Sequence, residues 1–378
     1  MRVKALALCL MAGFGTGAYA QDSTQTLQQA LQRIPQMVLT VPEAMQVSFM
    51  DVQAWRSLEK AGPTPDGMRR LSLAQSIRPL QSIGYGLDAW SQNAKIAFDE
   101  VSYFAAFGQG PANLTYWGLK DKQAVETFVG KLKQVDFVPV QAEVPGVLAN
   151  GEANKMDLKK ANARDPWRGQ MGTTSFVFPL ESALVQTPTA EGIKFLAQPK
   201  PSVADSAGVA ATLAGLKEAV PAKDGRIVQA AVISPVIGLQ AVDPMSILPG
   251  PSGNLETAKR NLEAAAAAAG RGVPPYSAGI IADAQINNVP ALVVSLAYAD
   301  CASAKTAVDG IGATWKETMP NAANAKFDGR TVQAGQQCAA VVSLTAAKAE
   351  NAGNPIMTEL VNRYIQRQPT LLQIGTSK

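Results

Sequence analysis

The sequence predicts an α+β protein made of two pseudo-repeated units, each a mixed or antiparallel sheet with helices packed on one face. Apolar, strand-like segments alternate with amphipathic helical segments along the chain of 378 residues. The segments 113–132 and 291–311 share the order of strand, capping aspartate and helix, and their aspartates, Asp121 and Asp300, are 179 residues apart. Because a repeated order at a fixed spacing is typical of an internal repeat, we expect the two units to have similar topology.

The elements of the first unit follow from local patterns. A strand beginning at Met45 is expected to run into a helix near Trp55, and two strands at 101–108 and 113–119 are joined by a Gly-Pro turn. Asp121 is expected to cap a helix whose apolar side chains are spaced to form one face, namely Ala124, Val125, Phe128, Val129 and Leu132. The pattern then indicates a strand region at 174–186, a helix at 203–220 and a strand region at 226–239.

The second unit repeats this alternation. An alanine-rich helix is predicted between a cap at Asn254 and a stop at Gly270. Strands are expected at 276–286, 291–299, 338–347 and 370–374, with a helix after Asp300 and another after the Asn354-Pro355 cap. We therefore divide the chain into residues 1–20, a first α+β domain at 21–225 and a second at 226–378. The segment 143–172 is a long insertion in the first domain with no counterpart in the second.

The first 20 residues have the pattern of a secretory signal peptide. Arg2 and Lys4 precede an apolar run that ends near Phe14, and the small-x-small pattern Ala18-Tyr19-Ala20 follows, so cleavage after Ala20 is expected. No later segment has the roughly 20 continuous apolar residues that a membrane-spanning helix requires. The sequence therefore predicts a soluble protein that is periplasmic or secreted.

The two remaining cysteines, Cys301 and Cys338, are expected to form a disulfide. An even number of cysteines in an oxidising compartment favours this pairing. The bond would close a loop of 38 residues, which stabilises the fold by up to about 4 kcal/mol on the chain-entropy argument. A reactive thiol at Cys301 is the alternative, since the start of a helix favours a thiolate.

Composition excludes several classes of function. The chain contains no histidine, which eliminates Ser-His-Asp and Cys-His catalysis and the commonest transition-metal ligand, so neither a metal nor a cofactor is expected. Without residues 1–20 the chain has 32 basic and 30 acidic residues, a net charge of +2. Because nucleic-acid binding needs a concentrated basic face, no nucleic-acid partner is expected.

Two histidine-free catalytic arrangements remain as alternatives. Ser57 lies three residues before Lys60, the spacing of a serine-lysine hydrolase, although the remaining elements of that signature are missing. Asp99 and Glu100 are adjacent carboxylates beside an aromatic strand. Neighbouring strand residues point to opposite faces, however, so this pair is not expected to act together in one cleft.

The insertion contains the candidate binding residues. Its segment KKANARDPWRG places cationic side chains around an indole, and we select Lys160, Arg164, Trp167 and Arg168. These residue types could bind an anionic polymer, a small ligand or an envelope protein. The alternative is a solvated loop whose tryptophan packs onto the domain.

Taken together, the sequence favours an exported cell-envelope protein that acts by binding or scaffolding without catalysis. A histidine-free hydrolase is one alternative. The other is a carrier of a small apolar ligand, held by the alternating apolar residues of 113–119 and 291–299.

Overall fold

The computed structural model describes residues 23–376, with gaps at 61, 75, 111, 198–199, 240–255, 349–351 and 369 and at scattered positions between 258 and 269. The expected signal peptide lies outside the described residues. So do the expected cap at Asn254 and most of the alanine-rich helix that follows it.

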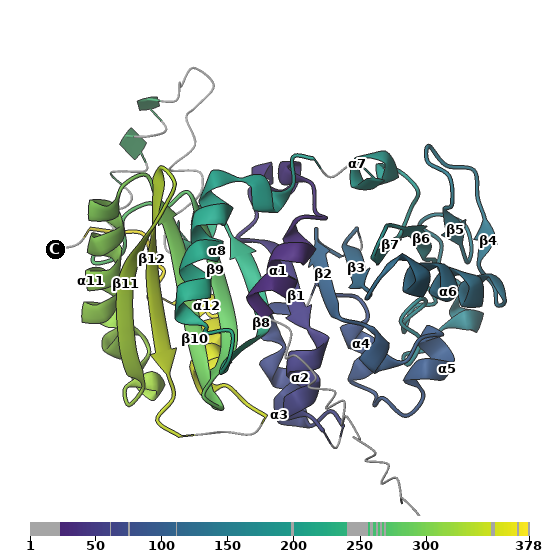
Figure 1. The fold of residues 1–378 in the computed structure, drawn as a ribbon, viewed down its shortest axis with the longest axis horizontal. Helices are drawn as coiled ribbons and strands as arrows, with labels where there is room; N and C mark the ends of the chain where they lie inside the picture. The colour runs from purple at the N-terminus through teal and green to yellow at the C-terminus, as the bar shows by residue number, and fades with distance from the viewer. Residues whose placement is uncertain are drawn as a thin grey trace, which may run out of the picture.

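One sheet of 12 strands forms the centre of the protein (Figure 1). Every named strand pair is antiparallel, in the order β11-β12-β10-β9-β8-β1-β2-β3-β7-β6-β5-β4. The strands of the N-terminal half are β1 (Met45–Asp51), β2 (Tyr103–Phe107), β3 (Leu114–Gly118), β4 (Val138–Pro139), β5 (Leu148–Ala149), β6 (Phe176–Pro179) and β7 (Ala183–Thr187). The strands of the C-terminal half are β8 (Gly225–Ile233), β9 (Ala278–Ile286), β10 (Val289–Tyr298), β11 (Lys326–Ala334) and β12 (Gln337–Thr345).

The α+β class is confirmed, but the two separate sheets that we expected are not. The proposed domain boundary, between 225 and 226, lies at the start of β8. Strand β8 pairs with β9 on one side and with β1 on the other, for example Ala230 with Phe49. Backbone hydrogen bonds therefore continue from the first expected unit into the second, and the two units share one sheet.

Helices cover both faces of this sheet, whereas the sequence analysis placed them on one. The longer helices are α1 (Ser23–Leu31), α6 (Lys122–Lys133), α8 (Ala207–Ala219), α11 (Cys301–Thr318) and α12 (Pro355–Ile365). The short helices are α2 (Val52–Leu58), α3 (Pro65–Arg70), α4 (Leu80–Ile83), α5 (Trp90–Ala94) and α7 (Ile193–Ala197). The 3-10 turns are η1 (Gln36–Thr40), η2 (Ser72–Ala74), η3 (Phe98–Glu100), η4 (Leu158–Lys160), η5 (Val203–Asp205), η6 (Pro235–Leu239) and η7 (Pro320–Ala322).

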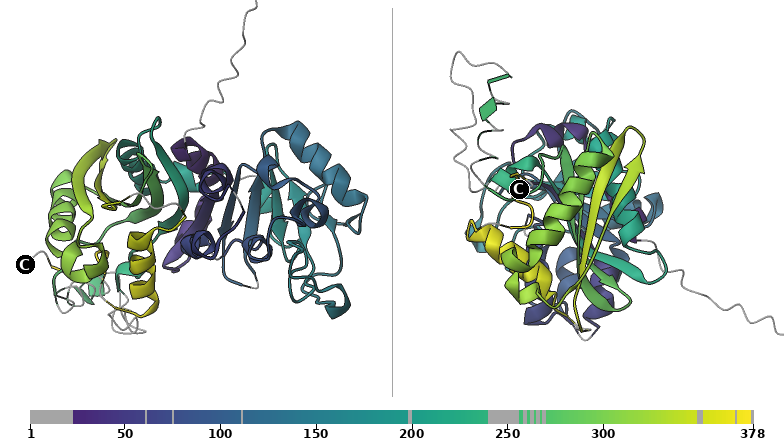
Figure 2. Two further views of the ribbon diagram at one scale, coloured as in Figure 1. Left: turned by 90° about the horizontal axis from the view of Figure 1, so that it is seen from below. Right: turned by 90° about the vertical axis from the view of Figure 1, so that its left-hand side faces the viewer.

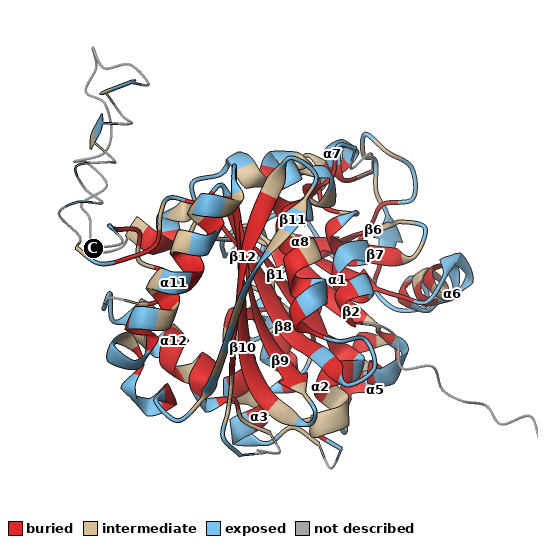
Figure 3. Ribbon diagram, turned by 60° about the vertical axis from the view of Figure 1, so that its left-hand side comes forward, coloured by how far each residue is buried: buried red, intermediate tan, exposed pale blue. Residues whose placement is uncertain are grey.

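The side chains form one core on one face and two on the other. On the first face, α1 and α8 pack over strands of both halves (Figures 1 and 2). On the opposite face, α11 and α12 cover the C-terminal half, while α2 to α6 cover the N-terminal half. Both faces of the central strands are consequently buried (Figure 3). This explains why β9 and β10 are apolar almost throughout instead of alternating with polar residues.

Three helix starts confirm the caps expected from the sequence. The carboxylate of Asp121 accepts a hydrogen bond from the backbone N–H of Ala124 at 2.9 Å, and Asp300 accepts one from Ser303 at 2.7 Å. The Asn354 side chain caps α12 in the same way, with Pro355 in the first turn. Each cap pairs with an N–H that the helix itself leaves unsatisfied.

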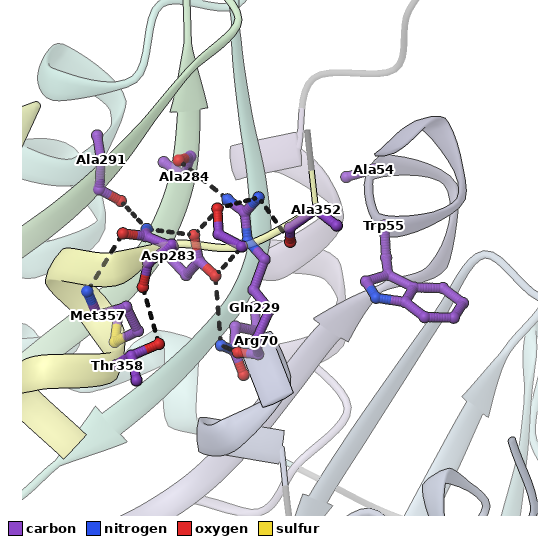
Figure 4. Close-up of polar contacts among 12 residues, drawn as sticks. Ala54, Trp55, Arg70, Gln229, Asp283, Ala284, Ala291, Ala352, Met357 and Thr358 are labelled. Carbon is purple, nitrogen blue, oxygen red and sulfur yellow. Dashed lines mark hydrogen bonds and ion pairs between the residues drawn. The ribbon is translucent and has the colours of Figure 1, made fainter. Parts of the chain in front are cut away.

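A buried polar cluster joins the two halves on the face opposite α1 and α8 (Figure 4). The guanidinium of Arg70, at the end of α3, forms two hydrogen bonds with the carboxylate of Asp283 on β9, at 2.7 and 2.6 Å, and neither side chain is exposed. Asn354 also donates to Asp283, at 2.7 Å. Gln229 on β8 accepts a hydrogen bond from the backbone N–H of Leu73. The cluster therefore connects α3, η2, β8, β9 and α12.

The expected disulfide between Cys301 and Cys338 is confirmed, with the two Cα atoms 5.0 Å apart. It joins the first residue of α11 to β12, beside the edge strand β11. A cysteine in a disulfide has no thiolate, so the reactive alternative for Cys301 does not apply. Among the described residues, no helix has the length and apolarity needed to cross a membrane.

Candidate functional site

The tryptophan of the insertion is part of the core. Trp167 is 3% exposed and stacks on Trp117 of β3, with ring centroids 4.6 Å apart and ring planes 9° from parallel. Its indole N–H donates to the carbonyl of Ala94 at 3.3 Å. The insertion is thus anchored to the sheet by this side chain, and the indole is not available to a ligand at the surface.

The three selected cations occupy different environments. Arg168 is buried, forms an ion pair with Asp136 and donates to the carbonyl of Asn150 at 2.6 Å. Lys160 and Arg164 are exposed and lie 3.9 Å from Asp136 and 3.6 Å from Asp88, respectively. The structure therefore does not assemble the four selected residues into one exposed surface. Only Lys160 and Arg164 remain accessible, and a binding role for them stays a prediction.

The residues of the catalytic alternatives have local structural partners. The hydroxyl of Ser57 donates to the carbonyl of Ala54 at 2.6 Å within α2. Asp99 lies 3.2 Å from Arg56 in an ion pair, and Glu100 accepts a hydrogen bond from the backbone N–H of Ala97 at 2.9 Å. In the part of the chain that the structure describes, no group of three or more Cys, Asp or Glu could hold a metal ion.

An apolar groove opens at one end of the N-terminal half of the sheet. Its deeper part has a volume of about 250 Å³ and is bordered by η1, by α7 and by the ends of β2 and β3. A second hollow of about 440 Å³ adjoins it and shares the walls Pro35, Met37 and Phe195. The apolar side chains of the deeper part are Pro35, Met37, Val38, Val41, Phe107, Leu114, Phe195 and Leu196. We call the two hollows together the apolar groove.

The groove is lined by large apolar side chains that are exposed and not packed in a core. Met37 is 57% exposed, Phe195 is 51% exposed and Val41 is 43% exposed. Single exposed apolar residues are normal on protein surfaces, but a group of them lining a concave site is typical of a binding surface. Met37, Val41 and Phe195 line this preformed hollow together, whereas other exposed apolar side chains of the N-terminal half, such as Val138 and Leu158, lie outside it.

Hydrogen bonds hold the η1 wall in place. The buried amide of Gln46 on β1 donates to the carbonyls of Leu39 and Val41, at 2.8 and 3.1 Å. The backbone N–H of Gln36 donates to the carbonyl of Pro201 at 2.9 Å. Because these bonds hold η1 on both sides, the groove is already formed before a ligand binds.

The α7 wall depends on the alternation of buried and exposed side chains in a short helix. Ile193 and Leu196 point into the core, which leaves Phe195 directed to the groove. Gly192 precedes the helix with φ of 72°, a conformation that side chains with a Cβ rarely adopt. The polar residues of the deeper hollow are Glu43, Gln46 and Glu191, so both of its charged groups are carboxylates.

The groove could not be predicted from the sequence. Its walls come from residues 35–46, 107–114 and 191–196, which are far apart along the chain. The sequence signal for the groove was weak. It consists of two short segments, QMVLT and GIKFLA, which contain more apolar side chains than one buried face requires. The apolar carrier alternative predicted a ligand against 113–119 and 291–299, but Tyr116, Trp117 and most of β10 are packed in the cores.

Comparison with known proteins provides one distant structural similarity. No family model matches the sequence, and no curated protein matches it. A solved structure titled "Structure of crystal form IV of TP0453" is similar to this chain at 10% identity, with a TM-score of 0.32, covering 84% of this chain and 95% of the other. A similarity of this extent carries no argument about function, which therefore depends on the site itself.

Proposed function

We propose that the protein is an exported, non-catalytic binding protein of the cell envelope, and that the apolar groove holds an apolar part of its ligand. The observation that carries the proposal is the concave group of exposed apolar side chains formed by Met37, Val41 and Phe195. Ligand sites are preferentially preformed, mainly apolar hollows with a few polar groups. An extracytoplasmic location is supported by the disulfide, since such bonds persist in oxidising compartments.

The charges at the groove indicate which ligands are favoured. Glu43 and Glu191 both line the deeper hollow, whereas Lys200, which lines the adjoining hollow, lies 3.3 Å from Asp205 in an ion pair. A ligand with a negative group near its apolar part would be repelled, whereas a neutral or cationic group would be tolerated or attracted. We therefore expect an apolar ligand that is neutral or positively charged, either a small molecule or an apolar side chain of a partner protein.

Binding of a neutral fluorescent apolar probe tests this proposal. We expect N-phenyl-1-naphthylamine to bind to the purified protein, and Phe195→Glu or Met37→Glu to weaken binding by about tenfold to a hundredfold, since each removes about 1.5–3 kcal/mol of apolar contact. The matched control is Leu158→Glu, because Leu158 is also an exposed apolar side chain, at 71% exposure, but lies outside the groove. The anionic probe 1-anilinonaphthalene-8-sulfonate should bind less tightly than the neutral one.

Two results would contradict the proposal. The first is the absence of saturable binding of the neutral probe to the folded protein. The second is an equal loss of affinity in Phe195→Glu and Leu158→Glu, which would place the probe elsewhere. Near-ultraviolet circular dichroism checks that each variant retains its aromatic packing. Native mass spectrometry of protein isolated gently from its own compartment would then show whether it carries a small molecule.

A further inference from the structure

A second pocket, which differs in chemistry from the apolar groove, lies between the insertion and α4. It has a volume of about 450 Å³. The insertion provides one wall from Asn154 to Met156 and another from Arg168 to Met171, and Arg78 and Gln81 form the opposite side. Asn113, the residue before β3, also lines it. We call this hollow the polar pocket.

The guanidinium of Arg78 is the central charged group of the polar pocket. It donates to the carbonyl of Trp167 at 2.9 Å and also to the hydroxyl of Thr173. No carboxylate among the described residues forms an ion pair with it. Burial lowers the pKa of Arg78 to about 10, and Asp165 acts in the opposite direction. Arg78 is therefore a half-buried cation whose fixed partners are neutral.

The other residues of the polar pocket are cationic, neutral polar and apolar, and the apolar ones are Met156, Met171 and Pro188. Its charged residues are Arg78, Lys155 and Arg168, and none of its lining residues is acidic. Arg168 is already paired with Asp136, but Lys155 is exposed and lies 3.5 Å from Glu152 in a solvent-accessible pair, which is a weak interaction. The neutral polar side chains are Ser76, Gln81, Asn113, Asn154, Gln170, Thr173 and Thr174.

We propose that the polar pocket binds an acidic sugar, with its carboxylate or phosphate on Arg78 and Lys155 and its hydroxyl groups on the surrounding amides. Guanidinium groups match the geometry of carboxylates and phosphates, and a cation with only neutral partners gains most from an anion. Amide side chains both donate and accept hydrogen bonds, as sugar hydroxyl groups require. This site is separate from the apolar groove and goes beyond the proposed function.

Isothermal titration calorimetry with defined sugars tests the proposal. The probes are D-galacturonate and D-galactose 6-phosphate, with D-galactose as the neutral control and inorganic phosphate as the anion without hydroxyl groups on a ring. We expect the two acidic sugars to bind more tightly than galactose or phosphate, and their affinity to fall as salt is added. Tri-galacturonate distinguishes a polymer from a free sugar as the natural source, because a polymer site gains affinity with added units.

Three variants locate the binding. Arg78→Gln should weaken binding of the acidic sugars by about tenfold or more, since it removes the charge-assisted hydrogen bonds. Lys155→Gln should weaken it by about two- to threefold, as expected for an exposed cation. Lys122→Gln is the matched control, because Lys122 is also exposed and paired with a glutamate but lies on α6 outside the pocket. It should bind like the unaltered protein.

Because Arg78 also holds the carbonyl of Trp167, near-ultraviolet circular dichroism of the stacked Trp117 and Trp167 rings shows whether Arg78→Gln preserves the insertion. If that signal changes, the charge reversal Lys155→Glu decides the question, since its side chain has no buried contact. Unchanged affinity in Lys155→Glu, or acidic sugars that bind no better than galactose, would overturn the proposal. Phe195→Glu should leave sugar binding intact, which separates a failure here from a failure at the apolar groove.

Discussion

The two halves of the sheet differ in regularity. Strands β8 to β12 have 9 or 10 residues each, whereas β1 to β7 have between 2 and 7. The long strands carry α8 and α11 and the disulfide, while the short strands are connected by short helices and by the insertion. Both the apolar groove and the polar pocket lie in the N-terminal half.

This contrast indicates how stability and binding are distributed. Side chains between long paired strands and well-formed helices interdigitate closely. The hollow of about 460 Å³ beside α12 has its other walls on α3 and α4 of the N-terminal half. Short strands end early, and the segments that extend beyond them form the walls of hollows. The C-terminal half is therefore expected to act as the framework, and the N-terminal half as the region that meets ligands. Three experiments test this division, from the largest expected effect to the smallest.

Removing the buried ion pair that joins the halves should have the largest effect on stability. We expect Asp283→Ala to lower the free energy of unfolding by about 3–5 kcal/mol, because it leaves the guanidinium of Arg70 buried without its partner. Urea unfolding followed by circular dichroism measures the change. The control is Arg330→Met on the edge strand β11, where the exposed pair with Asp328 should contribute about 1 kcal/mol or less. Equal losses in the two variants would show that the buried pair contributes no more to stability than an exposed one.

Removing the disulfide should destabilise the framework without affecting the groove. We expect the double variant Cys301→Ala/Cys338→Ala to lose about 2–4 kcal/mol of unfolding free energy. Its affinity for N-phenyl-1-naphthylamine should stay the same, because the groove lies in the other half of the sheet. Urea unfolding and probe titration, each with and without reductant, measure both quantities. A parallel loss of stability and probe affinity would refute the division between framework and binding region.

The carboxyl of Asp51 should produce a smaller, pH-dependent effect at the centre of the sheet. Asp51 caps α2 at the end of β1, and burial raises its pKa from 3.8 to about 6, although hydrogen bonds from Ala54 and Ser23 act in the opposite direction. The folded state therefore retains this proton when the unfolded state has lost it, so the contribution of Asp51 to stability falls as pH rises from about 4 to 6. Above pH 6 the cost is about 2–3 kcal/mol.

Asp51→Asn isolates this contribution, since asparagine also caps helices and carries no charge. The stability of the variant relative to the unaltered protein should increase between pH 4 and pH 7, as measured by urea unfolding at several pH values. A difference that stays constant over this range would mean that the carboxyl does not titrate there.

The sequence predicted the features that depend on local patterns. The caps at Asp121, Asp300 and Asn354 are confirmed because a cap involves residues only three positions apart. The disulfide followed from cysteine count and compartment. The single sheet did not follow, because the pairing of β1 with β8 joins strands that are distant in sequence and depends on no local signal.

The site residues illustrate the same limit. The sequence shows cations beside Trp167 but not its stacking partner Trp117, which is 50 residues earlier. The sequence therefore left two interpretations of Trp167, a binding residue or a side chain packed onto the domain, and its stacking partner and hydrogen-bond acceptor show the packed arrangement. Likewise Arg78 has no sequence feature that distinguishes it, because its lack of an acidic partner is a property of the assembled pocket. Of the four residues selected in the insertion, only Arg168 lines the polar pocket, and neither Arg78 nor Lys155 was selected.

The central position of β1 also determines when the sheet can be completed. Strand β1 is synthesised early, but its partner β8 follows only after the whole remainder of the N-terminal half. One edge of the apolar strand β1 pairs with β2. Until β8 is made, the other edge of β1 has no partner and could pair with another chain. Pairing of β1 with β8 is distant in sequence and therefore slow to form, and the chain is most at risk of aggregation while this pairing is incomplete. Its yield should therefore depend on protection of the newly made N-terminal half.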